Sequence, residues 1–249
     1  MEPESPLPLM KRTILLLLSA LPLLAQETPR FQPPKEVGPG LFEVGTVKLD
    51  KNTNTVTIPA KVNMTNGLVE YYCVTSKGST HESVIVSDAG PQNVHVAMLL
   101  LGAKGAAPKE GTPTPGQIDA EFLAKLPKLV GDRVMLSVRW KDADGKEQTV
   151  PAERWVMQRI VAKNKPAEEK PMADGPWLYN GSYLHEGRFV AEGQGIYAAI
   201  NTMPSALINN PRPGANNDEM WFANESVVPP VGTPVDFIIK LENAQETQK

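Results

Sequence analysis

Proline and glycine recur along the whole chain and limit the length of any helix. The 249 residues include 24 prolines and 19 glycines. Proline removes a backbone donor and glycine ends regular elements, so this spacing favours short strands and turns. Between the breaks, apolar and polar residues alternate, as they do from Val44 to Leu49, which is typical of half-buried strands. Apolar residues make up 41% of the chain, enough for a core.

The alternating stretches predict four antiparallel hairpins and three helices. Hairpins are expected over residues 41–64, 67–88, 131–151 and 176–200. The stretch "PQNVHVAMLLL" predicts a helix over Pro91–Leu101, apolar nearly all round and therefore buried. Residues 117–129 and 152–160 predict two short helices. The expected fold class is α+β: β-rich, with antiparallel hairpins packed against one buried helix and two short helices.

The N-terminal segment resembles a secretory signal peptide. "MKRTILLLLSALPLLA" begins at Met10, with two basic residues followed by an apolar run that ends at Ala25. Because Pro22 interrupts this run and the run is short for a bilayer, we expect cleavage after Ala25; an N-terminal membrane anchor is the alternative. The acidic residues before Met10 do not suit a signal peptide, so Met10 is a candidate start. We expect an exported protein, periplasmic or extracellular.

Cysteine content and charge exclude several classes of function. Cys73 is the single cysteine of the chain, so an internal disulfide, an iron–sulfur cluster and a thiolate-rich zinc site are not expected. The net charge is −3 and the basic residues are not interleaved with aromatics, so nucleic acid is not an expected partner. No cofactor is predicted, and no segment after the signal is apolar enough to cross a membrane.

The predicted hairpin over residues 67–88 contains the candidate catalytic residues. With its turn at Gly78, Cys73 would pair with Ser83, and alternation would place His81 on the same face, with Glu82 on the other. A thiol beside an imidazole is the arrangement of an activated cysteine. His81 is also a candidate metal ligand. The alternative is that Cys73 packs as a small apolar residue, and a slip of one residue would separate the group.

The second histidine of this region, His95, has a different expected role. In the predicted geometry, His81 lies about 20 Å from the turn that precedes the helix, whereas His95 lies only about 6 Å beyond that turn. A shared metal site is therefore not expected. We expect His95 to be a partly buried helix residue that is hydrogen-bonded to a neighbour. Trp177, Tyr179 and Tyr183 alternate along one stretch, and they indicate core packing or a binding face.

Several motifs resemble the YdjY-type domain of exported bacterial proteins. They are "KGSTHES", "VHVAMLLLGA", "GDRVMLSVRW", "PAERW" and "PWLYNGSYLHEGRFVAEGQGIYAAI", and the similarity covers residues 55–200, with a looser match beyond. The resemblance implies no established activity. Some members have been described as ferredoxin-like, a role that a chain with one cysteine does not support. The recurring histidines of the family correspond to His81 and His95.

These observations give an expected organisation and function. The segments are a signal peptide (1–25), a Pro-rich linker (26–40), a YdjY-like domain (41–165), a β-rich region that is a second domain or part of the first (172–242), and a polar tail (243–249). We expect an exported domain that binds a small ligand or an envelope protein. One alternative is an enzyme or metalloprotein centred on Cys73, His81, Glu82 and Ser83, and another is a structural component of an envelope assembly. The sequence does not decide whether the chain is an enzyme.

Overall fold

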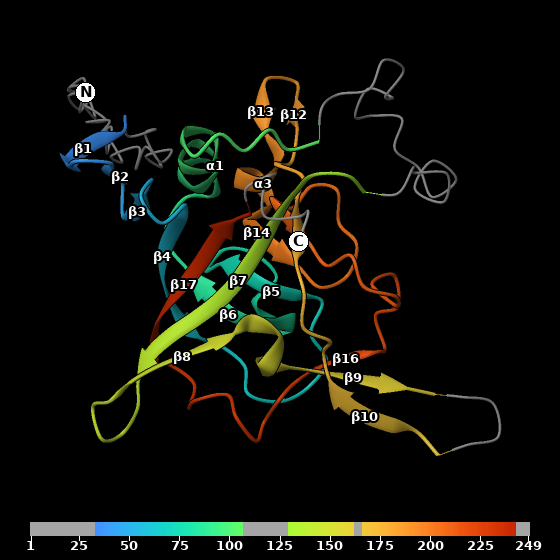
Figure 1. Ribbon diagram of the computed structural model, residues 1–249. Coiled ribbons are helices and arrows are strands. Elements are labelled where there is room, and N and C mark those ends of the chain that lie inside the picture. The colour runs from blue at the N-terminus through green and yellow to red at the C-terminus, as the bar shows by residue number, and fades with distance from the viewer. Residues whose placement is uncertain (1–32, 107–128, 162–165, 243–249) are drawn as a thin grey trace, which may run out of the picture. The chain divides into compact units, whose positions relative to one another are not determined.

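Eight strands of the protein close into a barrel-like ring in the computed structural model (Figure 1), which describes residues 33–106, 129–161 and 166–242. The ring closes because β4 pairs with both β17 and β6. In spatial order its strands are β4 (Thr55–Val62), β17 (Pro234–Leu241), β7 (Asp132–Lys141), β11 (Trp177–Tyr179), β15 (Ile208–Asn209), β14 (Ile196–Ala199), β5 (Tyr71–Thr75) and β6 (Ser83–Ser87).

The remaining described strands extend this ring or lie beside it. Three strands continue the sheet outward from β4: β3 (Val47–Asp50), β2 (Leu41–Val44) and β1 (Lys35–Gly38). β8 (Glu147–Pro151) pairs with β7. A separate sheet has the order β10 (Glu168–Pro171), β9 (Val156–Ile160) and β16 (Trp221–Ala223), and β12 (Leu184–His185) with β13 (Arg188–Phe189) forms a small hairpin.

The helical elements are short. They are α1 (Pro91–Leu100), α3 (Val190–Gln194) and the 3₁₀ turns η1 (Thr80–Glu82) and η2 (Ala152–Trp155). Pro91 occupies the first turn of α1, and the carboxylate of Glu192 on α3 accepts a hydrogen bond from the free N–H of Gln92 at 2.8 Å, which satisfies one of the unpaired donors at the helix start. None of the helices in the described ranges is both long and apolar enough to span a bilayer.

Alternating side chains of the ring strands build the core. On β17, Val235, Phe237, Ile239 and Leu241 are buried, while the residues between them are at least partly exposed. Phe237 stacks on Tyr72 of β5 across the interior, with ring centroids 5.5 Å apart. Burying an apolar side chain of this size stabilises the fold by about 1.5–3 kcal/mol. The ring is therefore a packed core.

Part of the predicted fold is confirmed. The protein is β-rich with few helices, and α1 begins at Pro91 as expected. β3 and β4 pair across the turn at residues 51–54, and β7 and β8 pair across "DADG". The closure of the strands into a ring was not predicted.

Four predicted elements differ from the structure. The prediction of a hairpin over residues 67–88 is wrong, because β5 and β6 run parallel and η1 lies between them. Only β12 and β13 of the predicted hairpin at 176–200 pair with each other. The helix predicted from residue 152 ends after one turn and continues as β9. Finally, α1 is not buried all round, since Leu99 is 48% exposed.

Other predicted segments fall outside the described residues. These are the signal peptide, the polar tail, most of the helix expected at 117–129 and the first part of the linker. The last part of that linker forms β1. The ring contains strands from residues 55–141 and from residues 177–241, so both regions contribute to one sheet.

Candidate functional site

Cys73 is a buried core residue on β5. Its side chain is fully buried, and burial raises the pKa of its thiol well above the usual value. Its register partner across the parallel pair is Ile85, so the predicted pairing with Ser83 is wrong. A thiol needs its thiolate form to act as a nucleophile. The surroundings of Cys73 disfavour that form.

The other three predicted residues do not converge on Cys73. Ser83 is buried at the start of β6, and its hydroxyl donates to the carbonyl of Ile85 at 2.8 Å. His81 and Glu82 belong to η1, where the His81 side chain is 75% exposed and its Nε2 lies 3.6 Å from a Glu82 carboxylate oxygen. The four residues therefore do not form a nucleophile–base arrangement.

A metal site around His81 also lacks ligands within the described residues. No group of three His, Cys, Asp or Glu side chains in these ranges is arranged to hold a metal ion. Glu70 is the additional carboxylate near η1: its backbone N–H donates to the carbonyl of Glu82, and burial together with the charges of Glu82 and Asp218 raises its pKa. This arrangement is a group of mutually repelling carboxylates beside an exposed imidazole.

His95 is the histidine that the fold holds in a defined position. It projects from α1, and its Nδ1 lies 2.7 Å from the hydroxyl of Tyr179 on β11. The ring of Phe189, at the end of β13, packs against the imidazole with centroids 4.8 Å apart. Three separate elements thus fix one half-buried imidazole. This confirms the expectation of a partly buried histidine with a hydrogen-bonded neighbour.

The hydrogen-bonding pattern assigns the tautomer of His95. Burial lowers the pKa of His95 and raises the pKa of Tyr179, so both groups are neutral near pH 7. The Tyr179 hydroxyl is buried and has no other partner among the described residues. The hydrogen of a buried hydroxyl group needs an acceptor. Because Nδ1 is the available partner, the Tyr179 hydroxyl donates to Nδ1. Nε2 therefore carries the imidazole hydrogen.

Two exposed leucines lie on the elements that carry His95 and Phe189. Leu99 lies one turn further along α1, on the same side of the helix as His95, and it is 48% exposed. Leu184 is directly opposite Phe189 in the β12–β13 pair, so the two side chains share a face of that hairpin. Leu184 is 67% exposed. We call these four residues, His95, Leu99, Leu184 and Phe189, the His95 face.

Tyr179 is held in place by a close backbone approach. A Cβ atom at Gly131 would collide with the carbonyl of Tyr179, so the chain can pass there only with glycine. Tyr179 and Trp177 are both fully buried, which shows that these two alternating aromatics pack in the core. Tyr183, which lies outside β11, is only partly buried.

Comparison with known families identifies the kind of domain. The family model of the YdjY domain matches residues 47–240. The chain belongs to the YdjY domain family. The match includes both His81 and His95, and it runs through every strand of the ring to residue 240. No curated protein and no solved structure matches this YdjY-domain chain.

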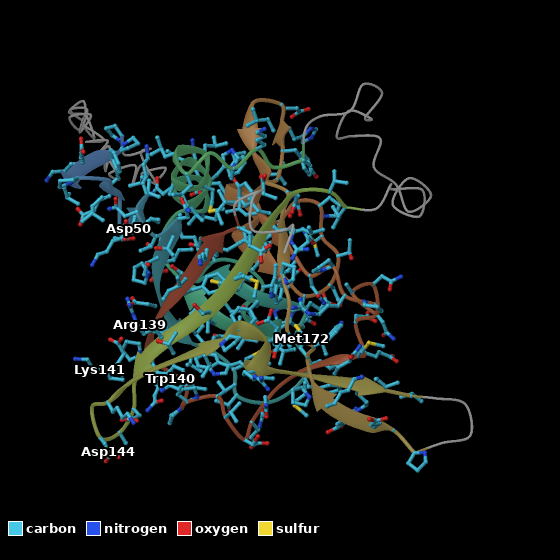
Figure 2. The ribbon with its side chains drawn as sticks, in the orientation of Figure 1. Asp50, Arg139, Trp140, Lys141, Asp144 and Met172 are labelled. Carbon is cyan, nitrogen blue, oxygen red and sulfur yellow. The ribbon has the colours of Figure 1, made fainter. Side chains whose placement is uncertain are left out.

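The YdjY domain also contains a buried ion pair that was not predicted from the sequence. Glu153 of η2 is fully buried, and its Oε1 accepts hydrogen bonds from Trp177 Nε1 at 2.8 Å and from Arg212 Nη2 at 2.7 Å. Trp155 of the same turn packs edge-on against Trp140 at 5.3 Å; Figure 2 shows Trp140 near the end of β7. An acidic residue in "PAERW" does not by itself signal burial, because its partner Arg212 is distant in sequence.

Proposed function

We propose that this YdjY-domain protein is an exported, non-catalytic binding domain of the cell envelope, and that it takes a peptide segment of a partner protein on the His95 face. The observation that carries the proposal is the fixed imidazole. Tyr179 occupies Nδ1, while Nε2–H makes no hydrogen bond to any described residue. The proposal is supported by the combination of an oriented donor and exposed leucines on the same elements, since recognition sites combine apolar contacts with a few placed polar groups.

The chemistry of the face defines the part of the partner that binds. Nε2–H is a donor, so its complement is a carbonyl or carboxylate oxygen. Leu99 and Leu184 are exposed apolar groups, so their complement is an apolar side chain, whose burial contributes about 25 cal/mol per Å². A peptide supplies both in adjacent positions.

The proposal of a non-catalytic role is supported by the surroundings of the candidate nucleophiles. Cys73 is fully buried with a raised thiol pKa, and the hydroxyl of Ser83 is engaged by a backbone carbonyl. Both side chains are buried, whereas the imidazole of His81 is exposed. Export is supported by the two basic residues and the apolar run that precede Ala25.

Site-directed cross-linking tests this function. Because Cys73 is buried, a Leu184→Cys variant can be labelled at one position with a benzophenone maleimide and then irradiated with envelope fractions of the source organism. Val231→Cys is the matched control, since Val231 is 63% exposed and lies outside the His95 face. We expect a discrete adduct from position 184, lost when His95→Ala is added, and none from position 231. Equal labelling from both positions, or no adduct from position 184, would contradict the proposal.

A further inference from the structure

Two buried side chains that contact the same tryptophan each have a polar atom without a partner among the described residues. The described residues contain four buried side-chain atoms without a hydrogen bond: Tyr72 Oη, Glu153 Oε2, Trp155 Nε1 and Asn201 Oδ1. Tyr72 packs edge-on against Trp177 with centroids 6.0 Å apart, and Trp177 Nε1 donates to Glu153 Oε1 at 2.8 Å. The phenol of Tyr72 and the carboxylate of Glu153 thus both lie beside Trp177, and the charge of Glu153 is near enough to help raise the pKa of Tyr72.

The donors that bond to Glu153 both reach Oε1, which leaves Oε2 without a hydrogen bond. The indole N–H of Trp177 and Nη2 of Arg212 both donate to Oε1. The guanidinium of Arg212 also donates to the carbonyls of Ala173 and Gly175, and to Asn210 Oδ1. A buried carboxylate oxygen without a donor, or a buried hydroxyl without an acceptor, costs about 1–3 kcal/mol. Such pairs of atoms in native proteins are commonly joined by an ordered water molecule.

We propose that a buried water molecule binds between Glu153 and Tyr72, donating a hydrogen bond to Glu153 Oε2 and accepting one from Tyr72 Oη. The ligand must donate to a carboxylate and accept from a phenol at once, and water is the smallest molecule that does both. It must also be neutral. The charge of Glu153 is already balanced by Arg212 at 2.7 Å, and a second buried cation would lack a partner.

The position of this water gives it a structural role. Tyr72 belongs to β5 in the wall of the ring, whereas Glu153 belongs to η2, which connects β8 to β9. The water links these two elements where no direct hydrogen bond joins the two side chains. A hydrogen bond to Oε2 also favours the ionised carboxylate, which opposes the rise in the Glu153 pKa caused by burial.

A high-resolution crystal structure of the purified, unmodified protein is the direct test. We expect a density peak about 2.6–3.0 Å from both Glu153 Oε2 and Tyr72 Oη. No peak, a direct hydrogen bond between the two side chains, or a peak about 2.3–2.6 Å from several oxygens, as for a bound cation, would each overturn the proposal. This test needs no variant, so it holds even if a substitution prevents folding.

Water relaxation dispersion in solution provides the second test. We expect the wild-type protein to show a long-lived internal water whose contribution is lost in Tyr72→Phe. Tyr197→Phe is the matched control, because the buried hydroxyl of Tyr197 has its own acceptor, the carbonyl of Ser87. A Tyr72→Phe variant that keeps the full relaxation amplitude would overturn the proposal, and so would an equal loss in both variants.

Discussion

Removing one hydroxyl group, in Tyr179→Phe, tests the geometry of the His95 face. The ring of Tyr179 is fully buried and stays in place in the variant, so no cavity larger than one oxygen atom forms. The change deletes the 2.7 Å hydrogen bond to His95 Nδ1. A typical hydrogen bond contributes about 0.5–1.5 kcal/mol, and an unsatisfied buried partner costs about 1–3 kcal/mol. Because His95 is half-buried and water can reach part of it, we expect the free energy of unfolding to decrease by about 1–2 kcal/mol.

Urea unfolding of the wild type and the variant measures this loss. The midpoint should fall while the m-value stays constant, since the surface exposed on unfolding is unchanged. For a domain of this size, the melting temperature should drop by about 2–4 °C for each kcal/mol. Tyr183→Phe is the matched control, because the hydroxyl of Tyr183 makes no hydrogen bond to a described residue. Equal stability of Tyr179→Phe and wild type would refute the hydrogen bond. Nitrogen NMR should also show that the variant loses the single Nε2–H tautomer of His95.

Three further predictions follow from burial and charge. Cys73 should not react with a thiol reagent in the native protein and should react fully after unfolding, since its side chain is buried; rapid native labelling would contradict this. The folded-state pKa of His95 lies below 6.5, so the unfolded state takes up a proton first and stability is lost as pH falls from about 6.5 towards the folded pKa. The unfolding free energy should therefore decrease less in His95→Gln than in wild type when the pH is lowered from above to below 6.5. Phe237→Ala should cost about 3–5 kcal/mol in urea unfolding, whereas Arg139→Ala, which breaks a partly exposed ion pair with Asp236, should cost about 0–1 kcal/mol.

The elements that were predicted correctly depend on local signals. The β7–β8 hairpin follows from alternation around "DADG", and α1 begins at Pro91 and ends before Gly102. In each case the residues that set the boundary lie within the element or next to it. The β-rich class and the position of His95 on a helix follow from such signals.

The parallel pairing of β5 and β6 could not be predicted from local signals. Parallel strands normally need a connection of a dozen or more residues, and only residues 76–82 separate Thr75 from Ser83. A hairpin was therefore the expected result. In the fold, β14 pairs with the other edge of β5 and β4 pairs with β6, so strands distant in sequence determine the register.

The candidate site depends on the same long-range contacts. His95 was expected to have a hydrogen-bonded neighbour, but its partners Tyr179 and Phe189 lie on strands far along the chain. The ion pair of Glu153 and Arg212 is likewise formed by residues distant in sequence. The group of Cys73, His81 and Ser83 depended on the hairpin register, and it separates once the strands are parallel.

The affinity of the cross-linked partner for two histidine variants tests the central claim most directly. His95→Ala removes the fixed donor, and His81→Ala removes an exposed imidazole outside the His95 face. Leaving the buried acceptor of the partner without its donor costs about 1–3 kcal/mol, which corresponds to a loss of roughly 5-fold to 150-fold in affinity. We predict a loss in this range for His95→Ala and wild-type affinity for His81→Ala, measured by calorimetry. Unchanged binding by His95→Ala, or an equal loss in both variants, would contradict the account.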